Sequence, residues 1–126
     1  MTMPLEDDLA SAAATGNTNR VKILLQSGVD VNGVNCFGRT PLQVMMMGGS
    51  PVAQLLLMQG ADPNIADRHT GTTPLHDAAR MGFLDTVEIL VQFLADPNSR
   101  DNRNCRPIDL AIESGHNNVV AFLKAL

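Results

Sequence analysis

Clusters of apolar residues recur at a regular spacing along this 126-residue chain, separated by polar segments rich in Gly, Asn and Asp. The clearest clusters are Ile23-Leu24-Leu25, Leu55-Leu56-Leu57 and Ile89-Leu90-Val91. Each lies in a segment with apolar residues three and four apart, which is typical of one buried helix face. A loop pattern of Asp, one residue and Asn follows each cluster, at Asp30-Val31-Asn32, Asp62-Pro63-Asn64 and Asp96-Pro97-Asn98. A period of about 33 residues predicts repeated helical units joined by turn-rich loops.

A helix-start signature stands near the middle of the chain. Thr73 can cap free backbone N–H groups, and Pro74 suits the first helical position, where no N–H is needed. The small pair Ala78-Ala79 lets a second helix approach closely. Gly82 can end the helix in a left-handed conformation without strain.

The stretch from Thr73 to Gly82 resembles the ankyrin-repeat signature T-P-L-H-x-A-A-x-x-G. Related stretches begin one period upstream at Thr40 and one period downstream at Arg106. The imidazole of His76 in this signature bonds Thr73 and neighbouring loop backbone, so we expect Thr73, His76 and Gly82 to be structural. The predicted fold is all-α, an ankyrin-repeat solenoid of four helix-turn-helix repeats with β-turn fingers. We place the repeats in one domain, 1–126, at about residues 5–36, 37–69, 70–102 and 103–126.

Individual helices follow from the same spacing. We expect helices at about 9–15, 18–26, 52–58 and 84–92, with residues 1–4 frayed. Val21, Leu24 and Leu25 should form the buried stripe of the second helix. The outer side of repeat four should be capped by polar residues, namely Asn117, Asn118 and Lys124.

Three loop positions before the first helices call for a positive φ. They are Gly38, Gly71 and Asn104, and glycine and asparagine tolerate that conformation best. Leu94 occupies the slot that glycine fills after the second helices of repeats one and two. A left-handed Leu94 would cost on the order of 1 kcal/mol.

Repeat two departs from the pattern. The stretch from Thr40 to Gly48 is one residue shorter than the stretch from Thr73 to Gly82, and Met45-Met46 replaces the small pair. The first helix of this repeat should therefore be cut to about one turn, which leaves several methionines partly exposed. They then either form a soft apolar contact patch or fill a gap in the core, as flexible thioethers do well.

Composition excludes several classes of function. The net charge is −4, and no lysine or arginine cluster is present to neutralise nucleic-acid phosphates. No apolar run approaches the roughly 20 residues of a membrane span, and no secretory signal is recognisable. The Cys and His residues lack metal-ligand spacing, and no phosphate loop or nucleophile motif is present. We therefore expect no nucleic-acid partner, membrane insertion, metal, cofactor or enzymatic activity.

Three carboxylates are candidates for binding a basic partner. Asp77 takes the variable position on the first helix of repeat three, Asp67 lies in the preceding finger, and Asp85 begins the following helix. From these positions they could border one groove beside the methionines. Such a groove would suit arginine side chains, because arginine bonds carboxylates bidentately. Each has a structural alternative: Asp77 pairs with Arg80, Asp67 shapes a turn, and Asp85 favours a helix N-terminus.

Residues 43–48 (QVMMMG) and 76–86 (HDAARMGFLDT) closely resemble the ankyrin-repeat inhibitors of the cyclin-D-dependent kinases, the tumour suppressors of cyclin-dependent kinase inhibitor 2 type. The resemblance spans nearly the whole chain. It implies a non-enzymatic inhibitor that binds cyclin-dependent kinases 4 and 6 beside the ATP cleft, opposite the cyclin. Turning the kinase lobes apart would block cyclin activation and arrest the cell cycle in the first gap phase.

The resemblance also assigns partner-binding roles by position. Asp77 would pair with a kinase arginine, and Arg80 would hold Asp77 in place and face the kinase. Asp67 and Asp85 would make further polar contacts. The apolar part of the contact would come from Met45, Met46 and Phe83.

The chain departs from that family in repeat one, where Asn17 and Asn19 replace an arginine and a glutamate. The repeat-four finger lacks the family's tryptophan-glycine pair, so we expect this repeat to be less stable. The alternative function is a general ankyrin-repeat module for another protein partner. We expect a monomer. Cys36 and Cys105 lie two repeats apart, beyond disulfide reach, and two reduced thiols suit the cytoplasm and nucleus.

Overall fold

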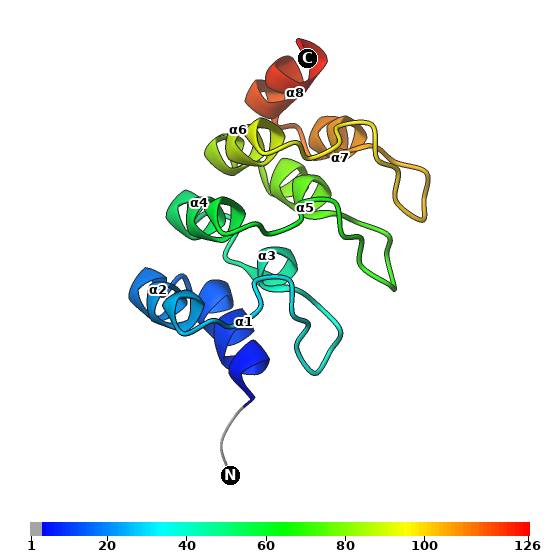
Figure 1. Cartoon of the computed structure of the whole chain (residues 1–126). Helices are drawn as coiled ribbons and strands as arrows, with labels where there is room; N and C mark the ends of the chain where they lie inside the picture. Colours follow the sequence, from blue (N-terminus) through cyan, green and yellow to red (C-terminus); the bar gives the residue numbers. More distant parts are fainter. Residues whose placement is uncertain (1–3) are drawn as a thin grey trace. The chain divides into compact units, whose positions relative to one another are not determined.

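The computed structural model describes residues 4–126 and contains, in that range, eight helices and no strand (Figure 1). The helices are α1 (Leu5–Thr15), α2 (Thr18–Gln26), α3 (Pro41–Val44), α4 (Ser50–Met58), α5 (Pro74–Met81), α6 (Leu84–Gln92), α7 (Pro107–Glu113) and α8 (Asn117–Lys124). The chain divides into two compact units, unit 1 at Met1–Asp62 and unit 2 at Pro63–Leu126. The all-α prediction is confirmed for the described residues, and the single domain stays a prediction.

Each unit holds two helix–loop–helix repeats, whose first helices lie side by side, as do their second helices (Figure 1). In unit 1, α1 contacts α3 and α2 contacts α4; in unit 2, α5 contacts α7 and α6 contacts α8. The same four positions are buried in repeats one and three because the following repeat covers them. They are Leu9, Ala13, Val21 and Leu24 in repeat one, and Leu75, Ala79, Val87 and Leu90 in repeat three.

The first helices of repeats two and three begin with a capping box. Thr40 Oγ1 accepts from the Gln43 N–H at 3.3 Å, and Gln43 Oε1 accepts from the Thr40 N–H at 2.7 Å. In repeat three, Thr73 Oγ1 accepts from the His76 N–H at 3.4 Å, and His76 Nδ1 accepts from the Thr73 N–H at 3.1 Å. These reciprocal bonds satisfy N–H groups that a helix start leaves free.

Repeat four retains only half of this box. Asp109 Oδ2 accepts from the Arg106 N–H at 2.9 Å and also from the Arg106 Nε at 3.3 Å. The backbone N–H of Arg106, followed by its guanidinium, holds the pKa of the Asp109 carboxyl below its usual range. Arginine has no side-chain acceptor, so the hydroxyl cap of the other two repeats is missing here.

Asparagines link successive repeats within each unit. The Asn32 side chain donates to the Gly60 carbonyl at 3.2 Å and accepts from the Asp62 N–H at 2.8 Å. In unit 2, Asn64 does the same with the Leu94 carbonyl, at 3.1 Å, and the Asp96 N–H, at 2.8 Å. The recurrent Asp-x-Asn pattern is therefore structural.

The loops before α3, α5 and α7 form fingers that extend beyond the helices (Figure 1). Gly38, Gly71 and Asn104 have φ of 75°, 74° and 62°, as predicted. In unit 2 the two fingers join, because the Asn102 N–H donates to the Thr70 carbonyl at 2.9 Å. Leu94 has φ 72° and is exposed, so no burial of its side chain offsets its backbone strain.

Two sequence-based expectations about unit 1 need correction. Helix α1 begins at Leu5 rather than near residue 9, since the Asp8 N–H already bonds the Pro4 carbonyl at 3.0 Å. The expected fraying of residues 1–4 lies, apart from Pro4, outside the described residues. Leu25 is only half-buried, because it edges a pocket between α2 and α4.

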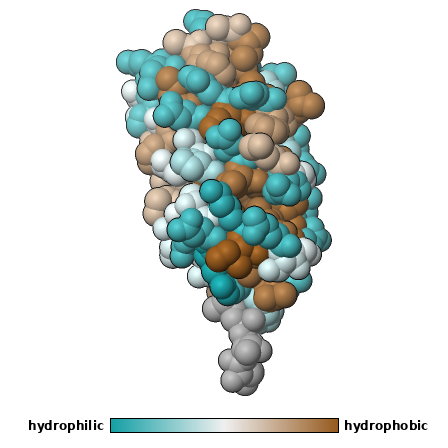
Figure 2. All heavy atoms as spheres, turned by 60° about the vertical axis from the view of Figure 1, so that its left-hand side comes forward, coloured by the Kyte–Doolittle hydropathy of each residue, from teal (hydrophilic) through white to brown (hydrophobic). Residues whose placement is uncertain are grey.

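The outer side of repeat four is less polar than predicted. Asn117, Asn118 and Lys124 are exposed, as expected. However, Ile112 takes the position of Ala79 and is 58% exposed beside a cavity of about 510 Å³. Figure 2 turns the side of the second helices toward the viewer, where apolar surface is interspersed with polar surface.

Candidate functional site

Asp77 lies on α5 with its carboxylate beside Arg80. Arg80 Nη2 lies 3.4 Å from Asp77 Oδ1. The carboxyl side chain retains 24% of its exposure. Burial, with a smaller contribution from the charge of Asp67, raises the pKa of Asp77 although Arg80 opposes the shift. The structure therefore presents a partly desolvated carboxylate at the surface of unit 2.

Asp67 lies in the finger that leads to α5. Its Oδ1 accepts from the His69 N–H at 2.7 Å and the Thr70 N–H at 3.3 Å, and the Asp67 N–H donates to the Thr72 carbonyl at 2.8 Å. The carboxylate thus shapes the turn, as one alternative proposed. Its charge also acts on Asp77, so the structure brings these two predicted residues together.

The other predicted residues of unit 2 occupy the two helices. Arg80 is exposed at the end of α5 and pairs with Asp77. Phe83 precedes α6 and is partly exposed. Asp85 is exposed in the first turn of α6, where a carboxylate complements the helix dipole.

His76, Thr73 and Gly82 lie at the two ends of α5. The ring of His76 is buried; its Nδ1 lies 3.1 Å from the Thr73 nitrogen and 2.9 Å from Thr73 Oγ1. Nε2 lies 2.8 Å from the Cys105 carbonyl oxygen. Gly82 ends the helix with φ 82°. The helix that carries Asp77 is thereby fixed at both ends.

Unit 1 contains the shortened helix that the missing residue predicted. Helix α3 has four residues and ends at Val44, and the extended backbone of the next residue, Met45, has ψ 155°. The Met46 N–H then donates to the Ala13 carbonyl of α1 at 3.0 Å, and the Met46 sulfur lies beside Gly16. The methionine segment therefore leaves the helix through the extended backbone of Met45 and is bonded to the end of α1.

The prediction that several methionines are partly exposed is wrong. Met45 and Met47 are only 3% and 6% exposed, whereas Met46 is 48% exposed. Met45 and Met47 therefore turn inward, whereas Met46 turns outward; Met47 lies in a turn in which the Gly49 N–H donates to the Met46 carbonyl at 2.8 Å. The methionines thus both fill the core and expose one thioether. They belong to a different unit from Asp77, so their placement beside the carboxylates stays a prediction.

An apolar groove of about 280 Å³ lies in unit 1 between α1 and the first finger. Ala10 and Ala14 of α1 line one side, and Phe37 of the finger, 69% exposed, lines the other. The Cys36 N–H donates to Asp7 Oδ1 at 2.8 Å, which ties the finger to the helix.

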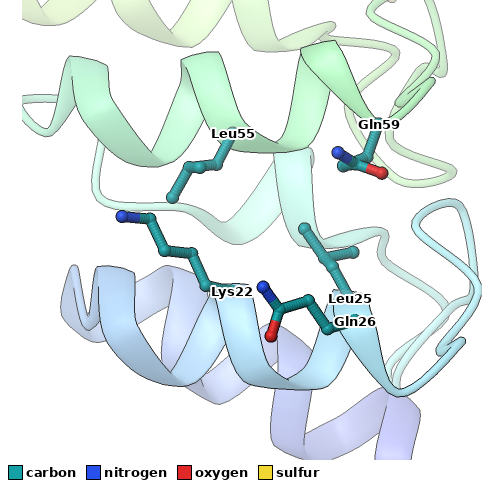
Figure 3. A pocket seen from close by; sticks show the side chains of 5 residues that line it. All are labelled: Lys22, Leu25, Gln26, Leu55 and Gln59. Carbon is teal, nitrogen blue, oxygen red and sulfur yellow. The ribbon is translucent and has the colours of Figure 1, made fainter.

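A second pocket of unit 1, of about 260 Å³, lies between α2 and α4 (Figure 3). Leu25 and Leu55 point into it from the two helices, with Lys22 at one end and Gln26 and Gln59 at the other. Its only titratable side chain is Lys22, so the lining offers no acid–base or nucleophilic pair.

Potential metal ligands are scattered over residues 4–126. No group of three or more His, Cys, Asp or Glu residues in that range is placed to hold a metal ion. None of the helices described is long and apolar enough to cross a membrane. Cys36 and Cys105 are free thiols.

One feature of the site was missed in the sequence. Phe37 edges the groove of unit 1. An exposed aromatic in a finger was a usable signal, since only 3% of this chain is aromatic.

Comparison with known proteins identifies the same repeats. The family model described as ankyrin repeats (3 copies) matches residues 9–67 and 45–125. Cyclin-dependent kinase 4 inhibitor B of Bos taurus is 53% identical over 118 residues, covering 94% of this chain and 90% of that protein. The human protein of that name is 52% identical over 119 residues, covering 94% and 86%.

A third relative is human cyclin-dependent kinase inhibitor 2A, which is 50% identical over 122 residues, covering 97% of this chain and 78% of that protein. These relatives are named as inhibitors of kinases rather than as enzymes, in agreement with the prediction of a non-enzymatic protein. With the ankyrin-repeat match and about half of the residues identical over most of its length, the chain belongs to the ankyrin-repeat family of cyclin-dependent kinase inhibitors.

Proposed function

We propose that this protein inhibits cyclin-dependent kinases 4 and 6 by binding each kinase beside the ATP cleft, opposite the cyclin. Binding turns the kinase lobes apart, which blocks activation by cyclin and arrests the cell cycle in the first gap phase. Inhibition of cyclin-dependent kinases is supported by the names of the relatives. The two kinases and the binding mode rest on the family resemblance of residues 43–48 and 76–86.

The observation that carries the proposal is the partly desolvated carboxylate of Asp77. A carboxylate that folding has already stripped of part of its water loses less hydration when an arginine binds. The guanidinium fork matches a carboxylate bidentately, which favours arginine over lysine. Asp77 therefore receives a kinase arginine, with Arg80 beside it, while Asp67 and Asp85 add polar contacts.

The apolar contacts come from Met46 and Phe83, both partly exposed. Met45 is buried and acts by supporting Met46. In unit 1, an apolar side chain of the kinase binds in the groove beside Phe37. A flexible thioether adapts to the surface it meets, which suits an inhibitor of two related kinases.

The mechanism requires no chemistry from the inhibitor. A ligand shifts a conformational equilibrium only by its difference in affinity for the two states. The inhibitor binds the kinase with its lobes turned apart more tightly than the active arrangement. We place this monomeric protein in the cytoplasm and nucleus, where its target kinases act.

A kinase assay tests the proposal. The protein should inhibit phosphorylation of a retinoblastoma-protein fragment by cyclin D–kinase 4 and cyclin D–kinase 6, but not by cyclin A–kinase 2. Glu88→Gln, an exposed change on α6, is the control and should inhibit like the unmodified protein. Failure to inhibit either cyclin D complex would favour a general ankyrin-repeat module for another partner.

A further inference from the structure

We propose that the open side of repeat four binds a short, non-helical acidic segment of a partner protein. The site is the cavity of about 510 Å³ beside α7 and α8, which we call the end cavity. It combines an apolar floor, an asparagine with an unused side-chain amide and an unpaired lysine. None of the residues predicted to contact the kinase lines it, so the inference does not depend on the kinase assignment.

The floor of the end cavity repeats an inter-repeat contact that is made elsewhere in unit 2. Its four residues each lie one repeat period after a residue of repeat three that repeat four covers, namely Ile108, Ile112, Val120 and Leu123. The counterparts in repeat three are fully buried, whereas Ile112 is 58% exposed. A terminal repeat normally turns a polar face to water. This one keeps an apolar surface, which is typical of a site that a partner covers.

Asn98 lines the end cavity as the third asparagine of the series that links successive repeats. Asn32 and Asn64 each donate to a main-chain carbonyl and accept from the main-chain N–H two residues further on, at 2.8 to 3.2 Å. The Asn98 backbone is held in the same kind of turn, because its N–H donates to Asp96 Oδ1 at 2.9 Å. Its side chain, however, hydrogen-bonds none of residues 4–126. A donor and an acceptor are therefore free for the main chain of a bound segment.

The two segments that the asparagines already bond define the occupant. They are Gly60-Ala61-Asp62 and Leu94-Ala95-Asp96, and their alanines are only 7% and 3% exposed. A segment that Asn98 bonds in this way buries a small apolar side chain and presents a carboxylate beside it. The volume of the end cavity lies within the roughly 300–1,000 Å³ of sites for small ligands, so it receives a few residues.

The charge around the end cavity favours an acidic occupant. Lys124 lines it from the last turn of α8 and forms no ion pair with the part of the chain that the structure describes. Arg106 lines it too, although its guanidinium lies 3.3 Å from Asp109 Oδ1. No Asp or Glu side chain of the described residues lines the cavity itself. The ammonium of Lys124 is therefore available to a carboxylate of the segment.

The first test asks whether the Asn98 side chain is unused in the fold. Asn64→Ala removes two hydrogen bonds, so the melting temperature should fall by about 5 °C or more. Asn98→Ala removes none and should change it by less than about 1 °C. Equal losses in the two variants would overturn the proposal, because Asn98 would then have a partner within the fold.

The second test measures binding of a defined peptide to the full chain. The probe is an acetylated, amidated hexapeptide with the sequence of residues 93–98, Phe-Leu-Ala-Asp-Pro-Asn. On titration, the NMR signals of the Asn98 side-chain amide and of the Ile112 and Val120 methyl groups should shift and saturate. A peptide with Asn in place of its Asp should bind about two- to fivefold more weakly. The absence of a saturable shift up to about 10 mM peptide would overturn the proposal.

Variants of the protein locate the bound peptide. Asn98→Ala should weaken binding by about tenfold, and Lys124→Gln by about two- to fivefold. The matched control is Asn117→Ala, since Asn117 is an exposed amide on α8 outside the end cavity, and its effect should be less than about twofold. An unchanged Kd in Asn98→Ala, or an equal loss in Asn117→Ala, would overturn the proposal.

Two further measurements distinguish other occupants of the end cavity. Sedimentation equilibrium should show a monomer; a dimer that Ile112→Ser dissociates would assign the surface to a second copy and overturn the proposal. Asn98→Ala should inhibit kinase 6 like the unmodified protein, and a loss of inhibition would assign the cavity to the kinase instead. If the unmodified protein does not inhibit kinase 6, the kinase assignment fails while the peptide titration still decides this proposal.

Discussion

The Nε2 atom of His76 lies 2.8 Å from the carbonyl oxygen of Cys105, a residue 29 positions further along the chain. At the other side of the ring, Nδ1 accepts from the Thr73 N–H at 3.1 Å. Nδ1 must therefore be free of hydrogen, and Nε2 carries the proton that it donates to Cys105. One buried imidazole thus joins the start of α5 to the finger of the next repeat.

Replacing this ring should destabilise unit 2. His76→Ala removes the bonds to Thr73 and Cys105 and leaves a cavity, so the free energy of unfolding should fall by about 2 to 4 kcal/mol. Urea denaturation followed by circular dichroism measures the change. The control is His69→Ala, since His69 is exposed in the finger and should alter stability by less than about 0.5 kcal/mol. A loss below about 1 kcal/mol for His76→Ala would show that the ring is not a structural link.

Two glycines of unit 2 separate backbone strain from steric contact. Gly82 and Gly115 have φ of 82° and 75°, so alanine is strained at both. A Cβ at Gly82 would lie 2.5 Å from His116 Nδ1, whereas at Gly115 nothing lies within 4 Å. Gly115→Ala should therefore cost about 1 kcal/mol and Gly82→Ala at least about 1 kcal/mol more. Equal losses in thermal or urea unfolding would contradict the close contact with His116.

Asp77 should stabilise binding at the expense of folding. Because burial raises its folded pKa, ionised Asp77 lowers stability at neutral pH, and the penalty is relieved as the pH falls through the raised pKa. Asp77→Asn should therefore be as stable as the unmodified protein at pH 7 or more stable by up to about 1 kcal/mol. Near pH 4 this difference should shrink.

The control for that comparison is Asp85→Asn, at the exposed start of α6. It loses a favourable interaction with the helix dipole, so its stability at pH 7 should fall by roughly 0.3 to 1 kcal/mol. Urea denaturation at both pH values measures all three proteins. Destabilisation of Asp77→Asn by more than that of Asp85→Asn would mean that Asp77 has a mainly structural role.

Hydrogen exchange should reveal where the fold opens first. Helix α3 has four residues, and the chain beyond it is held to α1 by the Met46-to-Ala13 bond. Few backbone bonds protect such a short helix, so amides of repeats one and two should exchange before those of α5 and α6. Uniform protection across the four repeats would contradict this expectation.

Local signals explain why much of the fold could be predicted. The positive φ of Asn104 and the cap at Thr73 depend on residues close in sequence, and each was recognisable by itself. The one-turn helix α3 followed from a missing residue and bulky methionines. By contrast, α1 begins at Leu5 without a side-chain cap, so no strong local signal predicted this early start.

The candidate site was less predictable, because its geometry depends on tertiary contacts. That Met46 faces outward while Met45 faces inward follows from extended backbone bonded to α1, which spacing alone does not reveal. The position of Asp77 on α5 was predictable, but the burial that raises its pKa was not.

The most direct test of the kinase assignment is capture of purified, cyclin-free kinases on the immobilised protein. Kinase 6 should be retained and kinase 2 should not. Asp77→Asn should weaken the capture of kinase 6 by about tenfold or more, because it removes the charge that receives the arginine. Capture of neither kinase would contradict specific inhibition through Asp77. Capture of kinase 6 by the Asp77→Asn variant as strongly as by the unmodified protein would also contradict it.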